Sequence, residues 1–192
     1  FRDTISEDKT NVSTSLYSQQ SEDFAYGIST IYSNIKAEDI NDTDLTVALS
    51  LVYRPEVTNL IVLEKLEIVN QDNSEITTEK LINNIAFNYM YDDFLETSYQ
   101  YGIKKTSNKI EEYDYNGITQ FSGIDLDYYM DEGWLFGAQA SGLYAHSANN
   151  YDYSFGTFVG HNIYKNTLIK IGYNMKGFND NDFSLQNYYY KG

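Results

Sequence analysis

The sequence predicts an all-β fold, an antiparallel up-and-down transmembrane β-barrel with about 10 strands present, from a parent barrel of about 12. Three observations predict it. Apolar and polar side chains alternate along short segments, the connections between these segments alternate in length, and aromatic residues gather near segment ends. The composition agrees with this fold class, because the 192 residues include 20 Tyr and 10 Phe but one Trp and one Pro.

The alternation is clearest in the segment 44–53, where Leu45, Val47, Leu49, Leu51 and Tyr53 alternate with Thr46, Ala48, Ser50 and Val52. Successive strand side chains point to opposite faces, so such a segment has one apolar and one polar face. We predict ten strands, at 10–19, 24–35, 44–53, 60–69, 79–90, 94–105, 117–130, 134–146, 154–164 and 167–177. Most have about the 9–11 residues of a tilted membrane strand.

The segment 60–69 departs from the pattern, because strict alternation places Glu64 among the apolar side chains of Leu60, Val62, Leu66 and Ile68. A β-bulge near Glu64 and Lys65 would rotate these charges inward. We therefore expect a bulge at this point.

The connections alternate in length along the chain. Short ones are expected at 20–23, 54–59, 91–93, 131–133 and 165–166, and long ones, rich in Asp, Asn, Ser and Glu, at 36–43, 70–78, 106–116 and 147–153. Outer-membrane barrels have short periplasmic turns and longer outer loops, whereas a β-sandwich has no reason for this sorting. The pattern favours a barrel with its long loops on the extracellular side.

Aromatic residues near strand ends form a predicted girdle on the apolar face, made of Tyr32, Tyr53, Tyr89, Tyr128, Trp134, Phe136, Tyr144, Phe155 and Tyr173. Amphipathic rings prefer the interface between lipid and water. The alternative is aromatic packing in a soluble β core.

Charge and composition exclude several classes of function. The net charge of −15 and the pI near 4.3 disfavour nucleic acid as a partner, because phosphates would be repelled. The absence of cysteine excludes disulfides and thiolate sites. The longest apolar runs are about four residues, as at 60–63, whereas a membrane-spanning helix needs about 20.

Several short motifs resemble one kind of barrel. They are Val52-Tyr53-Arg54-Pro55, Leu63-Glu64-Lys65-Leu66, Asn83-Asn84 with Phe87-Asn88-Tyr89, Tyr101-Gly102-Ile103-Lys104, Tyr151-Asp152-Tyr153, Gly172-Tyr173-Asn174, Gly177-Phe178 and Asp182-Phe183-Ser184. Their order over residues 11–184 resembles the C-terminal outer-membrane β-barrel domain of large repeat-bearing Gram-negative surface proteins. The resemblance implies that the chain anchors, or helps to export, upstream extracellular repeats of the same polypeptide. It also implies outer-membrane lipid, lipopolysaccharide and the barrel assembly machinery as partners.

Both ends differ from that pattern. Such barrels end on a strand with a terminal aromatic residue, whereas residues 188–192 precede an expected strand, and residues 1–9 are expected to form a loop after an earlier strand. We expect one domain over 1–192 that lacks one strand at each end.

Six charged side chains are expected in the lumen on this register: Glu96, Lys104, Asp125, Asp127, Lys170 and Lys176. Because the strands 94–105 and 117–130 are neighbours, opposite charges are expected to pair between them. A packed lumen that keeps the barrel rigid is the preferred interpretation. A constriction that selects ions in a small porin-like channel is the alternative.

Chemical sites are weakly indicated. His146, Ser147 and Asp152 are the residues for a hydrolase at the rim, but adjacent positions on a strand point to opposite faces. His146 and His161 are better explained as interface residues, so we expect no enzyme. Asp180 and Asp182 are weak candidates for loosely bound divalent cations, although a complete calcium loop is absent, and no cofactor is expected.

The expected function is therefore an outer-membrane anchor for a larger surface protein. A small diffusion channel and an outer-membrane hydrolase with a rim active site are the alternatives.

Overall fold

The computed structural model describes residues 8–37, 40–73, 75–110, 112–164, 167–176 and 181–183. The strands are β1 (Asp8–Gln19), β2 (Phe24–Ala37), β3 (Ile40–Tyr53), β4 (Leu60–Asp72), β5 (Ile76–Met90), β6 (Leu95–Ile110), β7 (Tyr113–Tyr129), β8 (Trp134–Ala145), β9 (Asn150–Tyr164) and β10 (Thr167–Lys176). Two short 3-10 helices, η1 (Asp131–Gly133) and η2 (Asn181–Phe183), complete the described elements. Within these ranges, no helix is long and apolar enough to cross a membrane.

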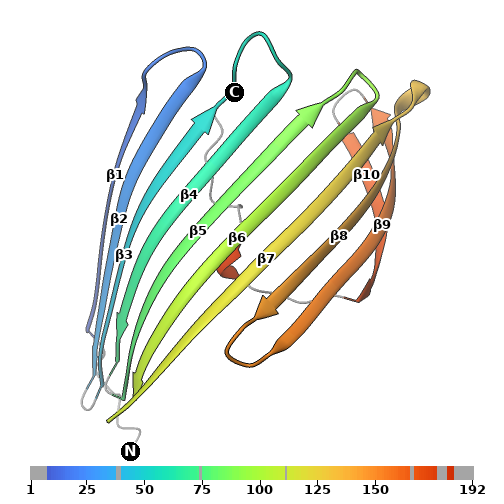
Figure 1. Cartoon of the computed structure of the whole chain (residues 1–192). Coiled ribbons are helices and arrows are strands. Elements are labelled where there is room, and N and C mark those ends of the chain that lie inside the picture. Colours follow the sequence, from blue (N-terminus) through green and yellow to red (C-terminus); the bar gives the residue numbers. More distant parts are fainter. Residues whose placement is uncertain are drawn as a thin grey trace, which may run out of the picture.

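All ten strands belong to a single sheet in the order of the sequence, and each neighbouring pair is antiparallel. The sheet curves, and η2 lies on its concave side (Figure 1). The prediction of an all-β, up-and-down fold is confirmed. Among the described residues, β1 pairs only with β2 and β10 only with β9.

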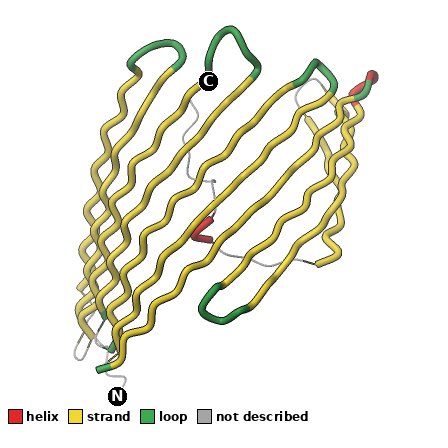
Figure 2. Tube along the Cα trace, viewed as in Figure 1, coloured by secondary structure: helices red, strands yellow, loops and turns green. Residues whose placement is uncertain are grey.

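The predicted long loops are wrong, because the strands continue through most of them. β6 and β7 pair from Leu95↔Tyr128 to Ile110↔Tyr113, and β2 and β3 pair up to Ala37↔Ile40. The connection between β8 and β9 spans only 146–149 (Figure 2). The polar composition of the segments predicted as long loops reflects exposure to water rather than irregular backbone. An antiparallel ladder pairs the backbone N–H and C=O groups whatever the side chains are.

The expected bulge in β4 is also wrong. Pairing with β5 runs without a shift from Leu60↔Tyr89 to Asp72↔Thr77. Glu64 therefore stays on the apolar face, where its Oε1 accepts a hydrogen bond of 3.0 Å from the Asn83 side-chain amide. This hydrogen bond lowers the free-energy cost of placing the carboxylate on an apolar face. A bulge would move the carboxylate inward but would interrupt the hydrogen bonds of the ladder.

The pairing register defines two faces, because directly opposite residues of antiparallel strands point to the same side. We call the face that contacts η2 the inner face and the opposite one the outer face. Apart from glycines, the buried strand residues all lie on the inner face: Ala25, Ala48, Leu63, Ile82, Asn84, Ala86 and Leu135. The core of the molecule is therefore on the concave side of the sheet.

Candidate functional site

The outer face is an exposed apolar surface. Many of its aliphatic side chains are 37–71% exposed, on strands across the sheet, as at Ile28, Leu45, Val47, Leu49, Ile68, Leu81, Ile124, Leu126, Ile169 and Ile171. Soluble monomers rarely expose contiguous apolar patches larger than a few hundred Å². A surface of this kind requires an apolar environment.

All nine aromatic residues of the predicted girdle lie on the outer face by the pairing register. Trp134 and Tyr144 stand at the two ends of the outer row of β8. Ten residues of strand extend about 33 Å, which is about 25 Å along a barrel axis at a tilt of about 40°. At that tilt, the separation would match the height of about 25 Å of the apolar band of a membrane barrel.

Several polar side chains interrupt the outer face, and two such places have specific contacts. One is the hydrogen-bonded pair of Glu64 and Asn83. The other is His161, whose ring lies 4.4 Å from that of Trp134, the residue opposite it in the ladder. Its buried Nδ1 has no hydrogen-bond partner in the described part of the chain. This tilted ring contact places His161 at the same end of the outer face as the indole of Trp134.

A shallow depression of about 510 Å³ also opens on the sheet. Small residues line its floor, including Ser122, Ala140 and Gly142, and Tyr99 and Tyr153 flank it. The Ser122 hydroxyl donates to the Tyr99 oxygen at 3.3 Å. It belongs to the same outer surface and has no convergent set of polar groups of the kind that fixes a specific ligand.

The predicted lumen charges Glu96, Lys104, Asp125, Asp127 and Lys170 lie on the inner face, and the side chain of Lys176 is outside the described set. Their partners differ from those expected, since Glu96 lies opposite Asp127, a charge of the same sign.

Other groups on the inner face contact these charged side chains. The Glu96 carboxylate accepts hydrogen bonds from the Asn88 amide at 2.6 Å and the Tyr129 hydroxyl at 3.2 Å. The Lys170 ammonium group lies 4.6 Å from the ring centre of Phe158.

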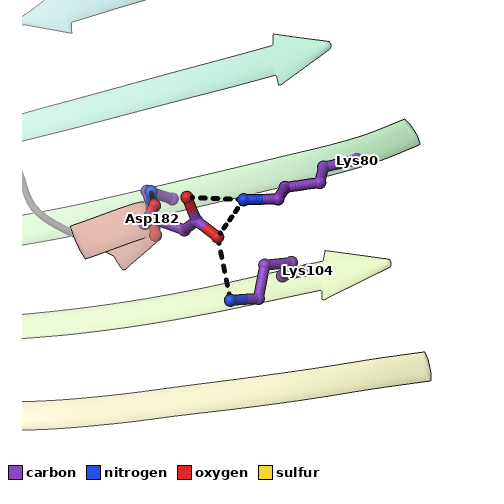
Figure 3. Close-up of polar contacts among 4 residues, drawn as sticks. Lys80, Lys104 and Asp182 are labelled. Carbon is purple, nitrogen blue, oxygen red and sulfur yellow. Dashed lines mark hydrogen bonds and ion pairs between the residues drawn. The ribbon is translucent and has the colours of Figure 1, made fainter. Parts of the chain in front are cut away.

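Two lysines of the inner face converge on the carboxylate of Asp182, in η2. Lys104 of β6 approaches it at 2.9 Å and Lys80 of β5 at 3.1 Å (Figure 3). Burial alone raises the pKa of Asp182, but the hydrogen bonds and charges of the two lysines outweigh burial and hold that pKa below its usual range. Asp182 therefore remains ionised and bound to both strands.

Phe183 is fixed beside it. The residue is 4% exposed. Its ring stacks on that of Phe121 with centroids 5.5 Å apart, and its centroid lies 5.3 Å from the Lys104 ammonium group. Gly102 makes room for the ring, since a Cβ at this position would overlap it. Side chains also hold the backbone: Asn84 donates to the Asp182 carbonyl at 3.0 Å and Gln100 to that of Phe183 at 2.6 Å.

This environment argues against a cation at Asp182, because two ammonium groups already surround its carboxylate. Asp180 lies outside the described residues. Within the described ranges, no group of three or more His, Cys, Asp and Glu side chains is arranged to hold a metal ion.

The residues of the predicted rim hydrolase do not form a catalytic arrangement. The His146 ring packs edge-on against Tyr144, with centroids 4.5 Å apart. Asp152 accepts a hydrogen bond from Asn150 at 3.2 Å. In the described part of the chain, no hydrogen bond joins His146 to Ser147 or Asp152.

An acidic cluster lies at the β1–β2 and β3–β4 turns, at one end of these strands. Asp23 accepts a hydrogen bond from the backbone N–H of Glu56 at 2.9 Å. The Glu22 side chain, through a hydrogen bond, and the nearby charge of Asp23 raise the pKa of Glu56 above its usual value. The cluster joins the two turns.

No protein-family model and no curated protein matches the chain. Among solved structures, it is similar to the translocator domain of the autotransporter NalP from Neisseria meningitidis, with 9% sequence identity and a TM-score of 0.36, over 91% of this chain and 77% of that one.

Proposed function

We propose that the chain forms a β-barrel in a bacterial outer membrane and anchors, or helps to export, a larger surface-exposed protein. The outer face carries this proposal: it exposes an apolar band between aromatic residues at a spacing of about 25 Å. The inner face has the opposite character, with its charges and the contacts to η2. A lipid environment on one side and a polar interior on the other explain both.

Closure of the sheet is part of the proposal. In hydrocarbon every backbone N–H and C=O must be paired within protein, and an open edge violates this requirement. β1 and β10 each have one neighbour among the described strands. We propose that each gains a second neighbour in the membrane, whether the other edge or an additional strand.

Anchoring is preferred over conduction because a segment of the chain lies inside. Asp182 and Phe183 contact β5, β6 and β7 from the concave side. Packed side chains in the interior favour a rigid support over an open pore. The proposed role is structural rather than enzymatic.

A surface-display experiment tests the anchoring role. An epitope is fused before Phe1, and the chain is directed to the outer membrane of a Gram-negative host. We expect it in the outer-membrane fraction, with heat-modifiable mobility on gels, and the epitope should be removed by protease added to intact cells. A periplasmic marker protein controls for cell integrity. Recovery in the soluble fraction would contradict the membrane proposal, and an epitope that stays protected would contradict the display role.

A diffusion channel remains the second candidate, favoured by the charged lining at Glu96 and Asp127. Planar bilayer recordings separate the two. The anchor predicts no steady conductance from the intact chain. A steady conductance that is abolished by Asp125→Asn with Asp127→Asn would favour the channel.

A further inference from the structure

We propose that the inner face of β5, β6 and β7 is a binding site for a peptide segment in which an acidic residue precedes an aromatic one, and that Asp182 and Phe183 occupy it as a tethered ligand. We call this site the acidic–aromatic cradle. It consists of Lys80, Asn84, Gln100, Gly102, Lys104 and Phe121.

The cradle recognises the acid with two cations. Lys80 and Lys104 lie on adjacent strands, and their ammonium groups converge on one carboxylate oxygen at 3.1 and 2.9 Å. Both lysine side chains are largely shielded, with 22% and 13% exposure. Charge-assisted hydrogen bonds in such a place discriminate strongly against a neutral side chain.

The ring is recognised by shape. Gly102 is the residue that permits this fit, because any larger residue would place a Cβ where the Phe183 ring lies. Phe121 provides a stacking surface at an interplanar angle of 17°, and Lys104 adds a cation–π contact. An aliphatic side chain would lose both ring contacts.

The backbone of the ligand is recognised as well, by side-chain amides of Asn84 and Gln100 that donate to two successive carbonyls. Asn84 is fully buried at 0% exposure, and its Oδ1 has no hydrogen-bond partner in the described part of the chain. A buried acceptor without a donor is costly. The tethered segment therefore leaves part of the cradle unused, and a ligand that offers an N–H there satisfies it better.

Such a site would hold an extended polypeptide within the barrel. This role rests on the proposed function, since only a barrel that anchors or exports a longer chain presents other segments to the interior. The binding itself does not depend on that function, so the two can be tested separately.

The test uses the full chain folded in lipid nanodiscs, with heat-modifiable mobility as a check of folding. Asp182→Asn with Phe183→Ala empties the cradle. The probe is a blocked, dye-labelled tetrapeptide with the sequence of residues 181–184, and fluorescence anisotropy measures its binding. Comparison peptides replace the acidic residue by its amide or the aromatic residue by alanine. Further variants add Lys104→Gln, or as a matched control Lys170→Gln, an inner-face lysine on β10 that lies against Phe158.

We expect the emptied variant to bind the probe, and Lys104→Gln to weaken binding at least about tenfold, the effect of one charge-assisted hydrogen bond. Lys170→Gln should leave binding unchanged, and both altered peptides should bind weakly. The intact chain should need a much higher probe concentration, because a tethered ligand acts at an effective concentration of about 1 mM.

Three results would overturn the proposal. They are no binding to a folded, emptied variant, binding that Lys104→Gln does not change, and competition by free acetate or phosphate as strong as that by the peptide. The last would identify a simple anion site. If the emptied variant does not fold, Gly102→Ala in the intact chain gives a second test, because its added Cβ should exclude the ring of Phe183 and the ring of the probe alike. That variant should therefore bind no probe even at concentrations that displace the tethered segment of the intact chain, and binding equal to that of the intact chain would overturn the proposal. None of these results bears on membrane insertion.

Discussion

At the scale of single residues, Glu64 is the clearest conflict between sequence pattern and environment. It keeps its place on the outer face, and Asn83 donates a hydrogen bond to it. A carboxylate on the lipid-facing surface of a barrel reduces its stability, by less than the 2–4 kcal/mol of a lysine or arginine at the midplane. The chain tolerates this cost rather than break the β4–β5 ladder.

Glu64→Gln should therefore stabilise the barrel in lipid vesicles. We expect the free energy of unfolding to rise by about 1 kcal/mol, because the negative charge is removed while an oxygen remains to accept the Asn83 hydrogen bond. Reversible urea unfolding measures the change. Glu67→Gln is the matched control on the inner face, where Glu67 pairs with Lys65 at 2.6 Å, and it should give no gain. A loss of stability from Glu64→Gln would show that the charge itself has a favourable partner.

Acid should release Phe183 at a pH set by Asp182. A carboxyl whose pKa is lower in the folded state stabilises folding above its unfolded pKa, and this contribution is lost as the pH falls through the folded value. The lysines lower the pKa of Asp182, so docking should persist at pH 4.5 and begin to weaken only below about 3.9, the usual Asp value, as the pH falls toward the lower pKa of the docked carboxyl. A fluorine label on the Phe183 ring, followed by NMR, reports docking. Asp182→Asn should show the released signal at every pH, and release near pH 6 would contradict the assignment.

The predictions for single residues succeeded where the alternation within one strand was enough to assign a face. They failed where segments far apart in the sequence contact each other. Period two alone placed Glu96 and Lys104 on the same face. It gave no sign that Asp182 would contact Lys80, because 102 residues separate them and the contact depends on the curvature of the sheet. Asn84 and Gln100 were missed for the same reason, although their polar character on an inner face was visible in the alternation.

At the scale of elements, strand positions followed from alternation but strand ends did not. Each of the ten predicted segments overlaps an observed strand. β3 begins at Ile40 rather than residue 44, and β6 ends at Ile110 rather than residue 105. Asp and Asn disfavour strands on average, but the ladder to a neighbour overrides this weak preference.

The β8–β9 turn offers a test at this scale. Asn149 has a φ of 46°, and its side-chain oxygen accepts a hydrogen bond from the Tyr144 hydroxyl at 3.0 Å. Asn149→Val should reduce the free energy of unfolding by about 1–2 kcal/mol, the cost of the left-handed region for a residue with a Cβ branch. Asn149→Gly should be close to neutral, because glycine adopts this φ without strain.

Urea unfolding of the two variants measures the difference. Ala148→Val, one position earlier in the turn and at a residue without a positive φ, is the control and should have little effect. Equal losses from Asn149→Gly and Asn149→Val would assign the effect to the Tyr144 hydrogen bond instead of the backbone.

At the scale of the whole molecule, the two faces of the sheet have opposite chemistry, and this contrast follows from the sequence. The outer face presents aliphatic and aromatic side chains, while the inner face holds charged groups and η2. The sequence did not predict that η2 occupies the interior, because its residues have the composition of an ordinary polar loop. The central claim is that the outer face contacts lipid.

Trp134 tests this claim most directly, because it is the single tryptophan of the chain. Its fluorescence is measured in bilayers of lipids brominated at different depths, beside two variants in a Trp134→Phe background: Leu49→Trp on the outer face and Ser50→Trp on the inner face of the same strand. We predict strongest quenching of Trp134 by shallow bromines, strong quenching of Leu49→Trp by deep ones, and little quenching of Ser50→Trp at any depth. Equal quenching at positions 49 and 50, or none at 49, would contradict the account.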